Sequence, residues 1–181
     1  MYQVAKQEWT AEETETLIRL LGKVKTDDGW WPTEECMRAA HGAMFAWASE
    51  LIITKMDKGN TREILLTLYE GGMEEFSGMW HIPGGYGSIM DESIHAACSR
   101  IAKRELGVNV WFLCALEQPD LWRTGEHPYG RPLSLYCWVY PLGEIAATDH
   151  CKFFDLRNLP DNTVPVHREF LRRDPLRQLK R

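Results

Sequence analysis

The segment from residue 80 to residue 108 constrains the fold more than any other part of the chain. It begins with Pro83-Gly84-Gly85, a tight turn that depends on the conformational freedom of glycine. Residues 92–106 then have the pattern of a helix, and Gly107 follows them as a helix stop. The segment therefore predicts a glycine turn, a short loop and a helix in direct succession.

Strand-like segments lie on both sides of this helix. Residues 51–55 and 64–69 predict a hairpin, with turn residues at 57–60 between them. Further strands are expected at residues 79–82, 108–116, 133–140 and 153–156. A last helix is expected at residues 166–172, with Pro165 near its first turn. This order of elements predicts an α/β sandwich with a mixed β-sheet between helices.

The N-terminal part of the chain predicts helices only. Thr10 and Glu13 have the spacing of a capping box at the start of one helix, which Gly22 is expected to end. A second helix is expected at residues 33–43. We therefore divide the chain into a helical N-terminal extension, residues 1–43, and a main domain, residues 44–181.

Composition excludes some classes of partner. The chain has 181 residues and a formal net charge of −5, and this acidic balance argues against a nucleic acid polymer, whose binding depends largely on basic side chains. The apolar runs are far shorter than the roughly 20 residues of a membrane-spanning helix, so no membrane partner is expected. The five cysteines are odd in number and form no CxxC pair, which is typical of reduced thiols in the cytoplasm.

Residues 80–108 resemble the Nudix box, whose pattern is G-x5-E-x7-R-E-U-x-E-E-x-G-U, with U an apolar residue. Counted from the second glycine of the turn, the strict spacing puts Asp91 at the first Glu, whereas Glu92 restores the seven-residue distance to Arg100. We expect Glu92 and Arg100 to form an ion pair that locks the loop onto the helix. The structural residues of the box are then Gly85, Glu92, Arg100 and Gly107. The resemblance implies the Nudix fold, an α/β/α sandwich with a mixed sheet.

The box departs from the family pattern in its cluster of acidic residues. Ile101 stands where the family has a Glu, and the paired Glu-Glu is replaced by Arg104 and Glu105. Clustered carboxylates bind the Mg²⁺ or Mn²⁺ ions that neutralise phosphate oxygens, so a site with several ions is not expected here. The resemblance leaves room for one Mg²⁺ or Mn²⁺ ion, held by Glu105, the carbonyl group of Gly84 and the side chain of Asp149.

This reduced pattern is most similar to one branch of the superfamily, the GDP-mannose mannosyl hydrolases. The resemblance to that branch implies a single-metal hydrolase that breaks the C–O bond of a nucleotide sugar. It assigns His150 as the general base, since an imidazole titrates near neutral pH. Glu105 belongs to the catalytic site in this comparison because it would hold the ion.

Other side chains are candidates for contact with a nucleotide ligand. Tyr86 and Trp122 have aromatic rings that could stack on a base or sugar, although buried packing is the alternative for both. Arg123 and Arg131 are candidates for contact with phosphates. The acidic residues of the preceding loop should instead repel a diphosphate; they are Glu70, Glu74 and Glu75.

Three functions remain open from the sequence. The first is a Mg²⁺-dependent hydrolase of a nucleotide sugar or a related nucleoside diphosphate derivative. The second is cleavage of a P–O–P bridge in another nucleoside diphosphate derivative. The third is a domain that has lost catalysis and binds a nucleotide or acts in regulation. The resemblance also implies a homodimer, because members of the family often are dimers.

Overall fold

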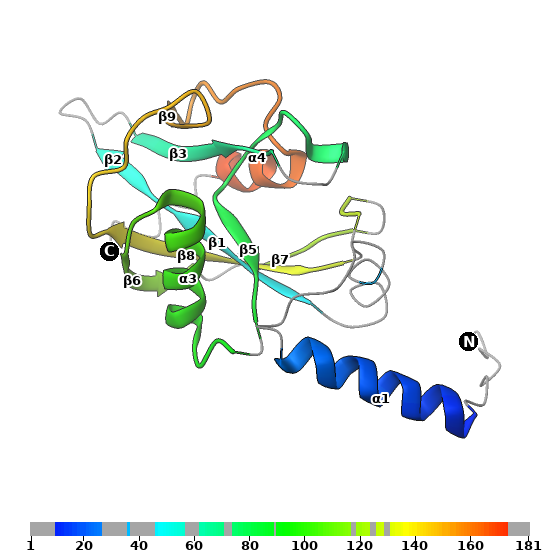
Figure 1. Cartoon of the computed structure of the whole chain (residues 1–181). Coiled ribbons are helices and arrows are strands. Elements are labelled where there is room, and N and C mark those ends of the chain that lie inside the picture. Colours follow the sequence, from blue (N-terminus) through cyan, green and yellow to red (C-terminus); the bar gives the residue numbers. More distant parts are fainter. Residues whose placement is uncertain are drawn as a thin grey trace.

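A computed structural model describes the chain over residues 10–26, 36, 46–56, 62–70, 74–88, 90–116, 119–123, 126–128 and 131–173. Its strands form two sheets, and helix α1 (Ala11–Thr26) lies apart from both of them in Figure 1. The second helix expected at residues 33–43 and the turn expected at residues 57–60 lie outside the described residues. In the part of the chain described above, no helix is long and apolar enough to cross a membrane.

The larger sheet is mixed, as expected. Its strands are β1 (Trp47–Ile52), β5 (Gly84–Tyr86), β6 (Val110–Ala115), β7 (Asp120–Leu121) and β8 (Leu133–Pro141). The order is β5-β1-β8-β6, with β7 also paired to β8. Strands β1 and β8 run parallel, and the other pairs are antiparallel.

The smaller sheet continues from the larger one. Strand β2 (Thr54–Met56) follows β1 after the single residue Ile53. It pairs with β3 (Arg62–Leu68), which pairs in turn with β4 (Trp80–His81) and with β9 (Cys151–Asp155). The expected hairpin of residues 51–55 and 64–69 is therefore present as the antiparallel pair β2 and β3.

Helices α3 (Ile94–Leu106) and α4 (Pro165–Arg172) pack against opposite faces of these strands. On β3 the buried side chains alternate: Leu65 belongs to the cluster that contains the apolar residues of α3. Ile64 and Leu66 belong to the cluster that contains those of α4. Such alternation places successive side chains on opposite faces of a strand. The expected α/β/α sandwich is confirmed.

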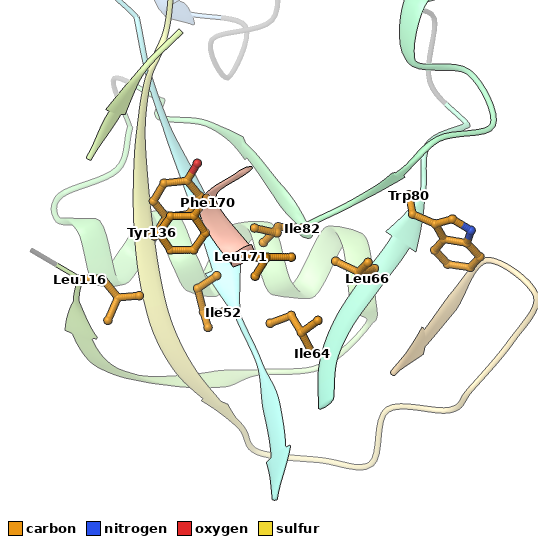
Figure 2. Close-up of a cluster of buried hydrophobic side chains, with 9 residues drawn as sticks. All are labelled: Ile52, Ile64, Leu66, Trp80, Ile82, Leu116, Tyr136, Phe170 and Leu171. Atoms are coloured by element: carbon orange, nitrogen blue, oxygen red, sulfur yellow. The ribbon is translucent and has the colours of Figure 1, made fainter. Parts of the chain in front are cut away.

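The core on the α4 side is drawn in Figure 2. In that view the ring of Tyr136 lies over the ring of Phe170, with ring centroids 3.4 Å apart and planes 7° from parallel. Seven apolar side chains complete the cluster: Ile52, Ile64, Leu66, Trp80, Ile82, Leu116 and Leu171. This packing fixes α4 on β8 and on the strands beside it.

The helix ends follow from their end residues. Thr10 and Glu13 form the expected capping box at the start of α1. Helix α1 nevertheless continues to Thr26, so the prediction that it ends at Gly22 is wrong, because one interior glycine weakens a helix without breaking it. Gly107 ends α3 as expected, with φ 69°, and its N–H donates to the carbonyl of Lys103.

Candidate active site

The loop that enters α3 is tied to the helix by Asp91. Its carboxylate accepts hydrogen bonds from Arg100 Nε at 2.9 Å and Nη2 at 2.7 Å, and from the N–H of Ser88 at 2.7 Å. These hydrogen bonds, first those from Arg100, hold the pKa of Asp91 below its usual range. Arg100 also donates to the carbonyl of Tyr86 at 2.9 Å and so connects β5 to the helix.

The expected ion pair between Glu92 and Arg100 is therefore wrong. Glu92 has an exposed side chain, whereas the side chain of Asp91 is only 4% exposed. The helix begins at Ile94 with Ser93 as its N-cap, so Glu92 lies just before the first turn and outside the helix face that carries Arg100. Asp91 lies at the strict distance of the first Glu from Gly85, and the one residue that the chain has in addition to the Nudix pattern falls between Asp91 and Arg100.

Gly84 stands next to a buried carboxylate. It pairs with Glu50 across strands β5 and β1, and a Cβ atom at Gly84 would collide with Oε2 of Glu50. Glu50 is only 5% exposed, and its Oε1 accepts a hydrogen bond from Ser134 Oγ at 3.0 Å. Ser134 in turn accepts one from the indole Nε1 of Trp122 at 2.9 Å. Gly84 and Gly85 belong to strand β5 and neither has a positive φ, so the prediction of a tight glycine turn here is wrong. The missing side chain of Gly84 instead makes room for a buried acidic residue.

Two histidines accompany Glu50. His167 on α4 is 4% exposed, and its Nδ1 accepts a hydrogen bond from the N–H of Ile82 at 3.1 Å. Its neutral ring therefore carries the proton on Nε2, which faces Glu50 Oε2 at 3.7 Å without a hydrogen-bond partner. His81 stacks on His167 with ring centroids 6.3 Å apart.

The charges of this group are interdependent. Burial raises the pKa of Glu50, but the electrostatic effect of the neighbouring His167 and the hydrogen bond from Ser134 lower it by more, so that it lies below its usual range. Burial, and then the charge of His167, lower the pKa of His81 to about 4. At neutral pH the group therefore combines an ionised Glu50 with a neutral His81.

The end of α3 brings together two of the three groups expected to hold an ion. Arg104 lies between them: its Nε donates to Glu105 Oε1 at 2.7 Å and its Nη2 to the carbonyl oxygen of Gly84 at 3.3 Å. A Cβ atom at Gly85 would lie 2.6 Å from that Nη2, so the guanidinium can lie against β5 only because Gly85 has no side chain. Ile101, where the family has a Glu, is fully buried in the core.

This arrangement does not fit a divalent ion as it stands. A cationic side chain already contacts the two oxygen donors, and Mg²⁺ or Mn²⁺ requires free oxygen ligands. Asp149, the third expected ligand, lies exposed in the turn before β9. Among the residues that the structure describes, no three His, Cys, Asp or Glu side chains gather closely enough to hold a metal ion.

The expected base lies at the end of the smaller sheet. His150 precedes β9, and its carbonyl accepts a hydrogen bond from the N–H of Leu68 at 2.8 Å. Its Nδ1 is 2.9 Å from Oε1 of Glu70, and the two side chains are 53% and 65% exposed. Glu70, which the sequence suggested as a source of repulsion toward phosphates, instead pairs with this imidazole.

The candidate ligand contacts lie in different environments. Trp122 is only 4% exposed and packs edge-on against His127 and His167, so buried packing describes it better than stacking on a ligand. The hydroxyl of Tyr86 is 3.2 Å from Nδ1 of His127. Arg131 is exposed, and its Nε donates to the carbonyl of Trp122 at 3.2 Å. Arg123 is exposed, and its Nε is 3.9 Å from Oε1 of Glu126.

Glu50, His81 and His167 were not expected from the sequence. A signal for Glu50 existed, because it is an acidic residue next to the apolar run of residues 51–53. No comparable signal pointed to the two histidines, which come from distant parts of the chain. Only the fold brings β4 and α4 to the same place.

No protein-family model and no curated protein matches the sequence. Solved structures do. The NUDIX domain of Shewanella oneidensis NrtR, crystallised with ADP ribose, is 16% identical, with a TM-score of 0.53, and the match covers 75% of this chain and 89% of that one. The Ap4A hydrolase of C. elegans is 16% identical, with a TM-score of 0.56 and coverage of 75% and 99%.

Two further matches agree with these. An ADP-ribose pyrophosphatase from Streptococcus suis is 19% identical, with a TM-score of 0.51 and coverage of 76% and 94%. The longer NrtR structure is 17% identical, with a TM-score of 0.53 and coverage of 74% of this chain; this chain spans only 64% of its length. At such identities the similarity concerns the fold, and this chain has the fold of the Nudix hydrolases.

Proposed function

We propose that this protein is a hydrolase of a nucleoside diphosphate derivative, with a nucleotide sugar as the substrate class. The fold is that of proteins whose names specify a nucleotide ligand or substrate, among them a domain crystallised with ADP ribose and an Ap4A hydrolase. The site keeps the glycine pair of the box, Gly84 and Gly85, and the carboxylate at the end of the box helix. The observation that carries the proposal is the pair formed by Glu70 and His150.

This pair suits a general base. The contact at 2.9 Å uses Nδ1 of His150 and leaves Nε2 to accept a proton from water. A carboxylate on the far nitrogen fixes the tautomer and stabilises the imidazolium that forms when the proton is taken up. Both side chains are exposed, so water and a ligand can reach the ring.

The pair also lies at the end of the sheet nearest the box. Thr67 on β3 pairs with His81 on β4 and with Cys151 on β9. Neighbouring strands are about 4.8 Å apart, so the residue after His150 lies about 10 Å from His81, which lies shortly before β5 and the box. A nucleotide sugar is long enough to contact both places.

The reaction that fits this base is hydrolysis at the sugar carbon. Water attacks the carbon, and a new C–O bond forms as the bond to the diphosphate oxygen breaks. Nε2 of His150 takes the proton of the water, and the electron pair of the broken bond stays on the nucleoside diphosphate. The departing diphosphate gains negative charge, so the site has to present a positive group to it.

A panel of nucleoside diphosphate sugars tests the proposal. We expect the protein to release free sugar and nucleoside diphosphate, and chromatography of the products detects both. His150→Gln should lower kcat by about 10²- to 10⁴-fold, since a positioned base contributes on that order. Glu70→Gln should lower kcat by a smaller factor because it orients the base and does not take up the proton.

The control is His95→Gln, which changes an exposed histidine on α3. Its kcat should equal that of the unchanged protein. Release of a nucleoside monophosphate and a sugar phosphate would instead show P–O–P cleavage. Full activity of the His150→Gln variant would remove His150 as the base.

A second function, a module that binds a nucleotide without hydrolysing it, is favoured by one observation. Arg104 occupies the place between the two oxygen donors where the family pattern would put an ion. If no sugar in the panel is turned over but ligands still raise the Tm, this second function holds. A homodimer, a cytoplasmic location and the absence of a nucleic acid partner stay predictions.

A further inference from the structure

The guanidinium of Arg104 is placed as an ion would be. It contacts Oε1 of Glu105 at 2.7 Å and the carbonyl oxygen of Gly84 at 3.3 Å, the two groups that the box pattern assigns to a metal. These contacts use two of the five N–H groups of a guanidinium. The side chain is 43% exposed, so a ligand in solution can reach it.

The surroundings are arranged for this position. Gly85 has no side chain, and a Cβ atom there would lie 2.6 Å from Nη2 of Arg104. Ile101, one turn earlier on α3, is fully buried and supplies no carboxylate. Residues three and four apart on a helix share a face, so the face that carries Glu105 has one acid and no second one beside it.

The balance of charge at this place is also different from that of a metal site. A cluster of carboxylates repels a phosphate group until a divalent ion neutralises it. Here the single carboxylate of Glu105 is already paired with a cation of the same chain. A phosphate therefore meets a neutral pair whose guanidinium has N–H groups that these two contacts do not use, and guanidinium groups bind phosphate oxygens well.

We propose that Arg104 is the resident cation of this site, so that phosphate groups bind to its guanidinium without Mg²⁺ or Mn²⁺. The inference rests on the proposed function only in taking a phosphate-bearing ligand. It assigns to the chain itself the positive group that the departing diphosphate requires. It also explains why Arg104 and Ile101 can replace two acidic residues of the family pattern together.

The first test measures metal binding without any substrate. Mn²⁺ is titrated into the full chain, and free Mn²⁺ is followed by electron paramagnetic resonance. Arg104→Glu removes the cation and adds a ligand, so we expect it to bind one Mn²⁺ at least 10-fold more tightly than the unchanged protein. Lys103→Glu makes the same change of charge at the neighbouring exposed position and should bind Mn²⁺ like the unchanged protein.

Equal Mn²⁺ affinity of Arg104→Glu and the unchanged protein would overturn the proposal. So would an equal gain in the Lys103→Glu variant, because it would show an effect of overall charge. Circular dichroism checks that each variant is folded.

The second test measures binding of pyrophosphate by calorimetry in EDTA. The unchanged protein should bind it, Arg104→Gln should bind at least 10-fold more weakly, and Lys103→Gln should be unaffected. Binding that requires Mg²⁺, or that is the same in Arg104→Gln, would contradict the inference. Neither test depends on turnover, so a protein that fails the sugar panel can still pass both.

Discussion

At the scale of single residues, the carboxylate of Asp91 anchors the loop that precedes α3. It accepts one N–H from the loop and two from Arg100, and Arg100 continues to the backbone of β5. Three elements of the site therefore depend on one short side chain. A longer side chain one position later, Glu92, is exposed and makes no comparable connection between loop and helix.

The first prediction concerns this anchor. Asp91→Asn keeps the size of the side chain but removes the charge, and it leaves Arg100 without its acidic partner. Hydrogen bonds to charged groups contribute about 1.5–3 kcal/mol, so we expect a loss of about 2 kcal/mol in the free energy of unfolding. Urea unfolding followed by circular dichroism measures it.

The matched variant is Glu92→Gln. As a change at an exposed position, it should alter the free energy of unfolding by less than about 0.5 kcal/mol. If the two variants lose the same stability, or if Glu92→Gln loses more, the assignment of Asp91 as the anchor fails.

The sequence predicted residues of the site where a spacing rule applies and missed them where only the fold brings residues together. Gly107 ends α3 as the box pattern predicts, and Arg104 contacts both Glu105 and the carbonyl of Gly84, which the sequence expected to lie close together. The contact of Arg104 with Gly84 needs strand β5 to lie beside α3, which no spacing states. The pairing of Glu70 with His150 likewise needs two loops to meet.

At the scale of elements, the ends of helices decide where the site residues lie. Helix α3 ends at Leu106 because Gly107 takes a left-handed conformation, with φ 69°. This end fixes Glu105 one residue before the last of the helix. The interior Gly22 of α1 has no such effect. The helix continues to Thr26, because one interior glycine weakens a helix without ending it.

The second prediction tests the end of α3. Gly107→Ala puts a side chain at a left-handed residue, which costs about 1–2 kcal/mol, while nothing lies within 4 Å of the new Cβ. We therefore expect the free energy of unfolding to fall by about 1 kcal/mol from conformation alone. Gly143→Ala is the control, since its Cβ would meet Val108 at an ordinary 3.6 Å.

Urea unfolding of both variants gives the comparison. Gly143→Ala should stay within about 0.5 kcal/mol of the unchanged protein. A Gly107→Ala variant as stable as Gly143→Ala would show that the chain can end α3 without a left-handed residue.

At the scale of the whole molecule, a cluster of three buried polar side chains lies between the larger sheet, the smaller sheet and α4. Glu50 comes from β1, His81 from β4 and His167 from α4. The group is largely withdrawn from water, so its protonation is coupled to folding. Acid should therefore weaken the whole structure and not one loop.

The third prediction is the direction of this dependence. The pKa of His81 is about 4 in the folded chain and near 6.5 when unfolded, so between these values the unfolded chain binds more protons. Stability from this group is present above pH 6.5 and is lost as the pH falls toward 4. The lowered pKa of Glu50 acts in the same direction below about pH 4.5.

Unfolding in urea at pH 7 and at pH 5 measures the effect. We expect the unchanged protein to lose up to about 2 kcal/mol more between these values than His81→Gln does. His95→Gln, which removes an exposed histidine, should keep the full dependence on pH. An equal loss in the unchanged protein and in His81→Gln would rule out His81 as the source.

The short connection between β1 in the larger sheet and β2 in the smaller sheet has a consequence for evolution. Between β1 and β2 stands only Ile53, fully surrounded by other atoms at 1% exposure. Side chains of a strand alternate between faces, so adding or deleting one residue here would move Thr54 and Lys55 to the opposite faces of the smaller sheet. We therefore expect insertions and deletions among relatives of this chain to fall in the loops. The number of residues between Glu50 and Thr54 should stay constant.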